Sequence, residues 1–399
     1  MIIIFRPNFL FFSTIAIIFV AKKYRTMNPF ITRGYAGPEY FCDREQETRD
    51  IIKLLTNGNN IALISPRRLG KTDLIRHCFS QPELKKEYYT FLIDIYSTSS
   101  LRDFVNMLGK AILDELKPRG RKAWEKFLAA LTSLKAEVSF DFTGNPVWGM
   151  GLSSIDNPGV TLDEIFGYLN NADRQCIVAI DEFQQINSYA NGEDVEATLR
   201  THIQRCPNAT FIFSGSRRHL MGKMFTSPSR PFYQSVITMG LAPIACDKYV
   251  AFCNDMFAKH KKSIAEGVVE HVYNLFDGVT LCLQRVMNVL FMNTPTGGLA
   301  TIDMVDEAVT YLINLLNDNF ETMMNQLPEK QRAVLIAIAH EGDVKSISSG
   351  AFNKKYRLLS PSSTVAATKA LIDKDFVTSE NGHYRVYDRF FALWLKERS

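Results

Sequence analysis

The chain has 399 residues, which is long for one hydrophobic core and predicts two or three domains. Hydrophobic residues make up 46% and charged residues 22%, as is ordinary for a globular protein. The net charge of +4 excludes a strongly basic protein, so any basic surface must be local. The seven cysteines form no Cys-x-x-Cys pair, which predicts buried free thiols in a reducing compartment and no zinc site.

Residues 1–26 are an apolar N-terminal extension. The run from Phe9 to Ala21 is shorter than the ~20 apolar residues of a membrane span, and no small-x-small cleavage site follows it. Three interpretations stay open: a weak membrane anchor, a helix packed on the body, or a translation start placed too early. We favour the third, with Met27 as the natural start, because the rest of the chain resembles a cytoplasmic protein. A membrane partner is therefore not expected.

Residues 27–60 lead into the first motif. They predict an amphipathic helix through Leu55, with Asp43 as its N-cap and acidic residues in its first turn. In a nucleotide-binding protein of this layout, Phe41 and Arg44 are candidates to cover the adenine. The alternative is a hydrophobic staple with a surface charge.

The stretch Ile61–Thr72 predicts a Walker A phosphate loop, because an apolar strand runs into a polar loop and a helix follows to Cys78. The backbone N–H groups of such a loop and the positive end of the helix dipole favour a bound phosphate. Lys71 would contact the β- and γ-phosphates of ATP, and the Thr72 hydroxyl would bind Mg²⁺. The predicted nucleotide-binding residues are Ser65, Pro66, Arg67, Arg68, Leu69, Gly70, Lys71 and Thr72.

Ser65 departs from the strict loop pattern GxxxxGK[ST], which has glycine at this position. Taken alone, the stretch therefore has an alternative interpretation as an ordinary strand, turn and helix with an exposed lysine.

The next elements alternate between strand and helix, and one hairpin is inserted among them. Alternating residues around the turn Thr143–Pro146 predict that hairpin. Thr161 and Glu164 have the spacing of a capping box. The predicted elements are a buried strand at Tyr89–Tyr96, helices at Leu101–Leu116 and within 117–135, a hairpin within 136–152, and a helix at Thr161–Leu169.

Gln175–Glu182 is an apolar strand that ends in two acids, as a Walker B motif does. In a phosphate-loop fold this strand lies beside the first one, so its carboxyl end faces the loop. Asp181 would support the Mg²⁺ ion, and Glu182 would orient and polarise the attacking water. Because the two motifs occur in the order that a phosphate-loop fold requires, we do not expect the pair to be a chance match.

The strand Ala209–Ser216 ends in serines, of which Ser214 or Ser216 would hydrogen-bond the water or the γ-phosphate; we select Ser216. A simple strand-end turn is the alternative. Arg230 is a further candidate catalytic residue, as a γ-phosphate or partner contact, although an arginine there more often covers a surface. The strand Val236–Pro243 closes the sheet.

The C-terminal part is predicted to be helical, with a small hairpin near its end. We divide the chain into a phosphate-loop core (27–245), a helical lid (246–326) and a winged helix (327–399). The winged helix carries 12 Lys and Arg against 8 Asp and Glu, which permits DNA binding. Its third helix offers only Lys369 and Lys374 as basic residues, so protein docking or autoinhibition is the favoured alternative.

These residues resemble the archaeal-type ATPase family of the AAA+/STAND phosphate-loop NTPases. The resemblance spans residues 27–399 and implies an α/β core of five parallel strands, a helical lid and a winged helix. It also implies that Lys71 and Thr72 bind phosphate and Mg²⁺, that Asp181 supports the metal and that Glu182 is the catalytic acid. The matching segments are Ser65–Thr72, Ile180–Gln185, Phe213–Ser216, Arg230–Tyr233 and Tyr387–Trp394.

Two functional hypotheses follow. The first is an ATP-hydrolysing switch that uses Mg²⁺, closes on binding ATP and opens after hydrolysis. The second is a DNA-binding regulator with a structural or nearly inert nucleotide site. A DNA or protein partner would bind through the winged helix, and a homo-oligomer is compatible with both hypotheses.

Overall fold

The computed structural model describes residues 27–116, 120–134, 139–140, 146–147, 155–380 and 382–398. The predictions for residues 1–26 lie outside these ranges. The described chain forms two compact units. The sheet unit contains residues 33–249 and 277–281, and the helical unit contains residues 27–32, 250–276 and 282–398.

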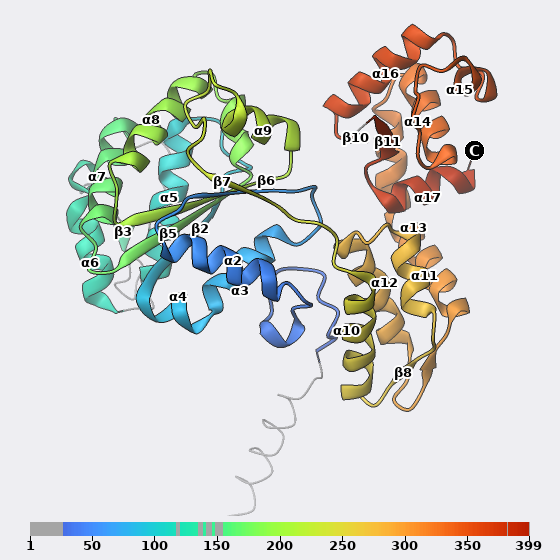
Figure 1. Ribbon diagram of the computed structural model, residues 1–399, viewed down its shortest axis with the longest axis horizontal. Coiled ribbons are helices and arrows are strands. Elements are labelled where there is room, and N and C mark those ends of the chain that lie inside the picture. Colours follow the sequence, from blue (N-terminus) through green and yellow to red (C-terminus); the bar gives the residue numbers. More distant parts are fainter. Residues whose placement is uncertain are drawn as a thin grey trace, which may run out of the picture. The chain divides into compact units, whose positions relative to one another are not determined.

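The sheet unit is built on five parallel strands in the order β2-β5-β6-β1-β7 (Figure 1). This confirms the α/β fold that the resemblance implied. The strand order places β5 and β1 on either side of β6, so the ends of all three meet at one edge of the sheet. The strands are β1 (Ile61–Ile64), β2 (Tyr88–Asp94), β5 (Gln175–Asp181), β6 (Ala209–Gly215) and β7 (Ile237–Gly240).

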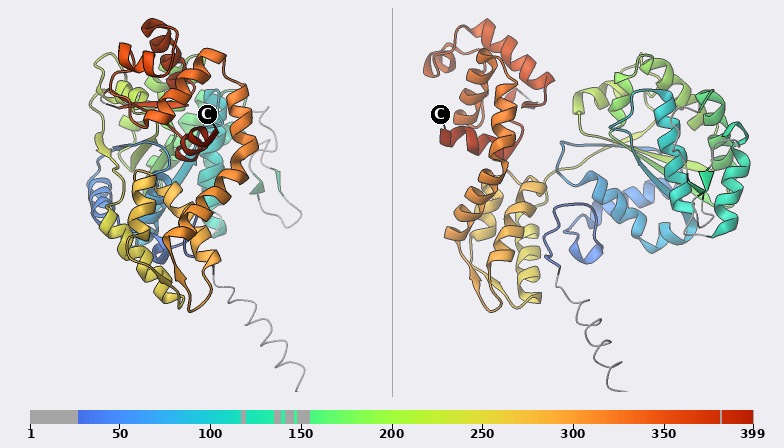
Figure 2. Two further views of the ribbon diagram at one scale, coloured as in Figure 1. Left: turned by 90° about the vertical axis from the view of Figure 1, so that its right-hand side faces the viewer. Right: turned by 180° about the vertical axis from the view of Figure 1, so that it is seen from behind.

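Helices cover both faces of this sheet (Figures 1 and 2). Strands β1, β2, β5 and β6 are mostly apolar and buried, whereas the edge strand β7 is mostly exposed. Successive side chains of β5 alternate between the two cores: Val178 and Ile180 pack on one side, and Ile177 and Ala179 on the other. One face carries α2 (Glu45–Thr56), α3 (Lys71–Ser80) and α4 (Pro82–Glu87). The other carries α5 (Leu101–Leu116), α6 (Arg121–Ala130), α7 (Pro158–Asn170), α8 (Gly192–Gln204) and α9 (Arg218–Thr226).

Local capping differs from the sequence prediction at two helices. Helix α7 begins at Pro158 and is capped by Asn157, whose side chain accepts a hydrogen bond from the Val160 N–H. The predicted capping box is therefore wrong. Helix α2 begins one residue later than a cap at Asp43 would place it, after Arg44 in a left-handed conformation. Within the predicted hairpin, β3 (Ser139–Phe140) pairs antiparallel with β4 (Pro146–Val147), and the intervening residues lie outside the described ranges.

The helical unit contains the predicted lid helices and the winged helix. Phe30 from the lead-in is fully buried here against Phe257 and Phe291, so residues 27–32 pack with the lid rather than with the sheet. A short parallel pair, β8 (Ser263–Ile264) with β9 (Leu299–Ala300), was not predicted. The lid elements are α10 (Cys246–Lys259), which begins in the sheet unit, β8 (Ser263–Ile264), α11 (Val268–Leu275), α12 (Thr280–Asn293), β9 (Leu299–Ala300) and α13 (Ile302–Asn325).

The winged helix has three helices, a two-stranded antiparallel wing and a final helix. The predicted boundary at residue 246 lies among the last residues of the sheet unit, and the boundary at residue 327 falls inside the helical unit. The division into a lid and a separate winged helix therefore stays a prediction. None of the helices in the described ranges combines the length and hydropathy that crossing a membrane needs. The elements are α14 (Glu329–Glu341), α15 (Gly350–Lys355), α16 (Pro361–Asp373), β10 (Val377–Glu380), β11 (His383–Val386) and α17 (Arg389–Arg398).

Candidate nucleotide-binding and catalytic site

The predicted phosphate loop connects β1 to α3, and its backbone shape depends on two left-handed residues. Gly70 has φ +88° and Arg68 has φ +71°. A Cβ added to Gly70 would meet no atom within 4 Å, so the backbone conformation rather than crowding favours glycine there. Helix α3 then begins at Lys71 without a side-chain cap, and the N–H groups of its first turn are left for an anion.

Lys71 folds back over the loop that precedes it. Its Nζ donates hydrogen bonds to the carbonyl oxygens of Ser65, at 2.9 Å, and Pro66, at 3.0 Å. The side chain is buried, and burial lowers the pKa of Lys71, while the nearby carboxylates of Asp181 and Glu182 act in the opposite direction. The alternative of an exposed lysine on an ordinary turn is therefore wrong.

Thr72 joins the loop to the acidic end of β5, because its hydroxyl donates a hydrogen bond to the Asp181 carboxylate. Asp181 is 5% exposed. A hydroxyl and a carboxylate side by side are ligands that suit Mg²⁺, which is usually held by one or two protein groups together with substrate phosphates. Among the described residues, no group of three or more His, Cys, Asp or Glu is arranged to hold a metal by itself.

Glu182 follows Asp181 in a left-handed conformation, with φ +55°. Its carboxylate accepts a hydrogen bond from the Ser216 hydroxyl at 2.8 Å, and Arg67 donates from Nε to the same hydroxyl at 3.2 Å. Of the two serines considered, Ser216 therefore lies in the site, whereas Ser214 is fully buried within β6. The phosphate loop, β5 and β6 thus bring Arg67, Glu182 and Ser216 together.

Asp94 and Gln184 are site residues to which the sequence analysis assigned no role. Asp94 ends β2 directly opposite Asp181 in the strand register. Burial raises the pKa of Asp94, and the charges of Asp181 and Glu182 raise it further. The sequence did contain a signal for Asp94, because it is the acidic residue at the end of an otherwise mostly apolar strand of a parallel sheet. Gln184 is buried and donates a hydrogen bond to Glu182.

Comparisons with known proteins agree with this geometry. The profile of an ATPase domain found predominantly in Archaea matches residues 41–286, and that of a probable winged helix domain matches residues 318–397. The chain belongs to this archaeal-type ATPase family. No curated protein sequence matches it.

Two solved structures show the same fold. A Walker-type ATPase of Pyrococcus abyssi is 19% identical, with a TM-score of 0.64, and the match covers 92% of this chain and 99% of that one. The ORC2 protein of Aeropyrum pernix, in its ADPNP–ADP complexes, is 14% identical with a TM-score of 0.57; the match covers 93% of this chain and 96% of that one. At these identities the likeness establishes the fold of the ATPase.

The two candidates for the adenine region of the ATPase lie in different surroundings. Phe41 stacks on His77 of α3, with ring centroids 4.2 Å apart and planes 14° apart. Arg44 is buried and donates hydrogen bonds to Glu47, at 2.7 Å, and to the carbonyl of Ala242, at 2.6 Å. Because Arg44 is buried, it is not the exposed charge that the alternative of a hydrophobic staple assumed. Its contact with adenine stays a proposal.

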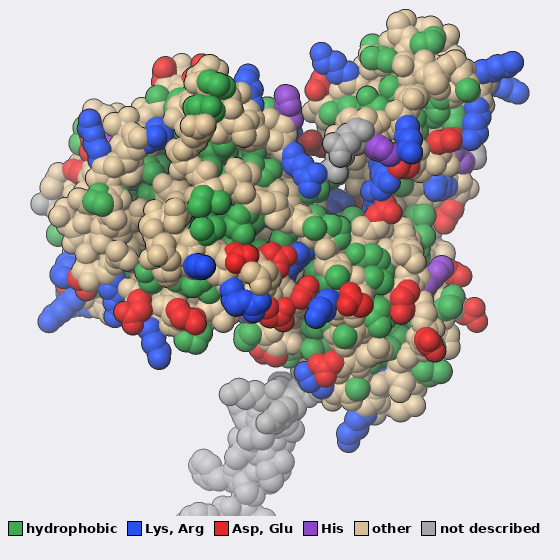
Figure 3. Space-filling view, viewed as in Figure 1, with side chains coloured by type: hydrophobic (Ala, Val, Ile, Leu, Met, Phe, Trp, Pro, Cys, Tyr) green, Lys and Arg blue, Asp and Glu red, His purple; other side chains and the backbone are tan. Residues whose placement is uncertain are grey.

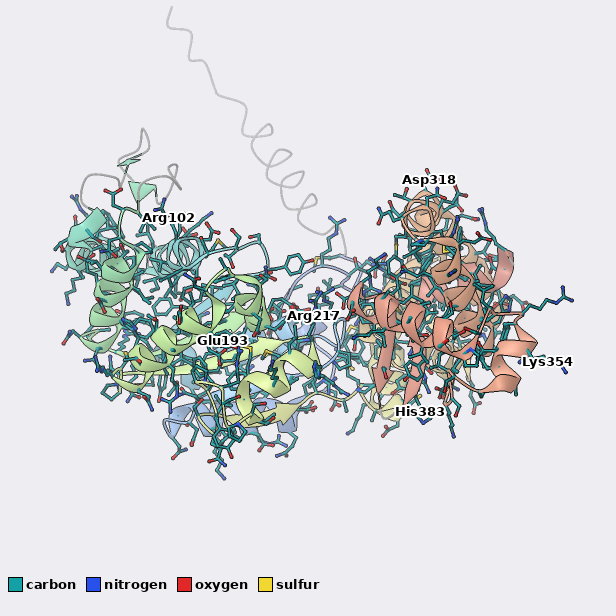
Figure 4. All side chains as sticks on the ribbon, turned by 90° about the horizontal axis from the view of Figure 1, so that it is seen from above. Arg102, Glu193, Arg217, Asp318, Lys354 and His383 are labelled. Carbon is teal, nitrogen blue, oxygen red and sulfur yellow. The ribbon has the colours of Figure 1, made fainter. Side chains whose placement is uncertain are left out.

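Arg230 is the predicted site residue that the structure does not bring to the carboxylates of β5. Arg230 is 7% exposed, and its guanidinium binds Glu196 and Glu193 of α8 and the side-chain oxygen of Asn187. Figure 4 labels Glu193 on the sheet unit. A buried guanidinium held by two carboxylates does not cover a surface, and a role at the γ-phosphate would require these bonds to break.

The start of α12 contacts the phosphate loop within the sheet unit. The Leu281 N–H donates a hydrogen bond to the Arg68 carbonyl at 3.1 Å. Residues 277–281 therefore belong to the sheet unit although the helix continues in the helical unit. This contact was not predicted, because it depends on a pair separated by more than two hundred residues.

Proposed function

We propose that the chain binds ATP with Mg²⁺ and hydrolyses it, and that this cycle drives a conformational switch. The observation that carries the proposal is the convergence of Lys71, Thr72, Asp181, Glu182 and Ser216 at one edge of the sheet. The family of the chain supports nucleotide binding by this edge.

Each residue has a defined task in this proposal. Lys71 would exchange its two loop carbonyls for phosphate oxygens, and the uncapped N–H groups of α3 would bind the same anion. Thr72 and Asp181 would hold Mg²⁺, which when bound neutralises phosphate charge. Glu182 would orient the attacking water and accept its proton, and Ser216 would fix the Glu182 carboxylate. A contact of Arg230 with the γ-phosphate or a partner, and contacts of Phe41 and Arg44 with adenine, are further proposals that ATP hydrolysis by this site does not require.

The test measures ATP binding and steady-state turnover of the full chain, with and without Mg²⁺. We expect Lys71→Ala to lose binding, and Glu182→Gln to keep binding while turnover falls by a factor of at least about 100. Lys53→Ala, which removes an exposed lysine of α2, is the control. Normal turnover by Glu182→Gln would show that the catalytic assignment is wrong, and absence of binding by the unmodified chain would remove the proposal.

DNA binding by the winged helix is a second candidate function. Lys354 of α15 and Lys369 of α16 are exposed, and Figure 4 shows Lys354 extending into solvent. In the wing, however, His383 and Arg385 both contact the Asp343 carboxylate, whose negative charge offsets that of Arg385. On the face shown in Figure 3, Lys and Arg lie among Asp and Glu side chains. These features support sequence-independent contact with phosphates better than base reading.

This candidate is tested by fluorescence anisotropy of a labelled duplex at several salt concentrations, without ATP. Binding that weakens steeply with salt and is lost in Lys354→Ala/Lys369→Ala would favour it. Absence of binding at low salt would favour protein docking instead.

A further inference from the structure

Gln184 is a buried glutamine that contacts the carboxylate of Glu182. It lies in the short 3-10 helix η4 (Phe183–Ser188) after β5, and its side chain is 6% exposed. Its amide Nε2 donates a hydrogen bond to Glu182 Oε2 and lies 3.4 Å from the Ser216 hydroxyl. The nitrogen must face Glu182, because a carboxylate only accepts hydrogen bonds and the amide oxygen would repel it.

The other end of the Gln184 amide is accommodated by a glycine. Its Oε1 is buried and finds no hydrogen-bond partner among the described residues. A Cβ added to Gly215 of β6 would lie 2.5 Å from that oxygen and from the Met221 side chain, so a larger residue here would require these side chains to shift. A buried amide oxygen without a partner costs stability. The arrangement is therefore not explained by stability alone.

The turn that carries Gln184 is held in place by its surroundings. The side-chain amide of Asn187 donates a hydrogen bond to the Gln184 carbonyl at 3.2 Å, and Arg230 donates to the Asn187 side-chain oxygen at 2.7 Å. The buried ion pairs of Arg230 thus support the turn that presents Gln184 to Glu182. A positioning group fixed in this way loses little entropy when it acts.

We propose that Gln184 is a positioning residue for ATP hydrolysis, which holds the Glu182 carboxylate in the orientation that the reaction uses. Gln184 and Ser216 both donate to Oε2, from two different elements, and this fixes the plane of the carboxylate. Because both of these hydrogen bonds go to Oε2, the proposal assigns the other carboxylate oxygen, Oε1, to the attacking water. The inference rests on the proposed hydrolysis and deepens it by naming the group that orients the base.

The decisive variant is Gln184→Met, which keeps the length and volume of the side chain but removes the amide. The matched control is Gln185→Met, since the neighbouring Gln185 amide donates instead to the Thr98 carbonyl, at 3.0 Å, and to Ser188, at 2.9 Å. We expect Gln184→Met to lower kcat roughly tenfold, to leave KM and ATP affinity within about twofold, and to retain or raise Tm because the unpaired oxygen is gone. Gln185→Met should leave kcat unchanged.

A double-mutant comparison separates positioning from general damage. In a Glu182→Gln background, Gln184→Met should cause no further loss of turnover, because the carboxylate that it orients is absent. An unchanged or increased kcat in Gln184→Met would overturn the proposal, and so would a loss of ATP affinity equal to the loss of kcat.

A second readout needs no turnover. In protein labelled with ¹⁵N-glutamine and free of nucleotide, the side-chain amide signal that disappears in Gln184→Met should shift in Glu182→Ala. An amide signal that keeps its position in Glu182→Ala would show that no such bond exists and would overturn the proposal. If the unmodified chain has no turnover, both the proposed function and the role of Gln184 are wrong. If turnover is normal in the unmodified chain and also in Gln184→Met, only the role of Gln184 is wrong.

Discussion

The hydroxyl of Thr72 donates a hydrogen bond to the carboxylate of Asp181, and this contact joins the first turn of α3 to the end of β5. The two residues are far apart in the chain and meet because β1 and β5 both flank β6 in a parallel sheet. A hydroxyl and a carboxylate held together in advance offer Mg²⁺ two oxygen ligands at the side of the phosphate loop.

From this contact we predict that Thr72→Ala loses most of the gain in ATP affinity that Mg²⁺ provides, whereas Thr72→Ser keeps it. The serine retains the hydroxyl, and the alanine leaves Asp181 without its donor. The measurement is ATP affinity with Mg²⁺ and with EDTA for the three proteins. An equal gain from Mg²⁺ in Thr72→Ala would mean that the hydroxyl does not hold the metal.

Lys71 should matter for binding much more than for folding. Burial lowers its pKa, so the charged form is disfavoured in the folded chain, but its ammonium group also satisfies the carbonyls of Ser65 and Pro66. We expect these effects to offset, so that Lys71→Met changes the free energy of unfolding by less than about 1 kcal/mol while ATP binding is lost. Urea denaturation and nucleotide titration check both parts, with the exposed Lys53→Met as control.

We expect the replacement of Arg230 to lower the stability of the fold. Glu196 is fully buried and its charge is balanced by Arg230, so Arg230→Met would leave a buried carboxylate without its cation. We expect a loss of about 3–5 kcal/mol in the free energy of unfolding, and partial recovery when Glu196→Gln is added. Urea denaturation measures both, and Lys223→Met, on the exposed side of α9, should cost little. A loss below about 1 kcal/mol in Arg230→Met would contradict the structural role.

The burial of His77 predicts that the stability of the fold depends on pH. Burial lowers the pKa of His77 below its ordinary value of 6.5, although Glu45 acts in the opposite direction. The unfolded chain then binds a proton more readily than the folded one, so this contribution to stability is complete above pH 6.5 and is lost as pH falls toward the lowered pKa. Urea denaturation between pH 5.5 and 7.5 should show a shallower slope for His77→Gln than for the unmodified chain. Equal slopes would assign the dependence to other groups.

Local sequence patterns were sufficient for many of the elements and for the two motifs, although not for α8, α9 or the short pair β8 and β9. The alternation of apolar residues and the turn signals encode secondary structure within a few residues, and helix α5 (Leu101–Leu116) has the predicted bounds. The phosphate loop is also local, because it connects β1 directly to α3, and Gly70, Lys71 and Thr72 follow one another at the start of that helix. The order of the motifs along the chain then indicated that Asp181 and Glu182 belong to the same site.

The further side chains that meet in or near the site were decided by the tertiary structure alone. Asp94 becomes a neighbour of Asp181 only through the pairing of β2 with β5, and the Gln184 amide that contacts Glu182 lies in space left by Gly215 on β6. Arg230 lies in a loop by sequence, yet it is buried by partners on α8 and η4. Strand order and side-chain packing arise from contacts between distant segments, and no pattern within one segment carries that information.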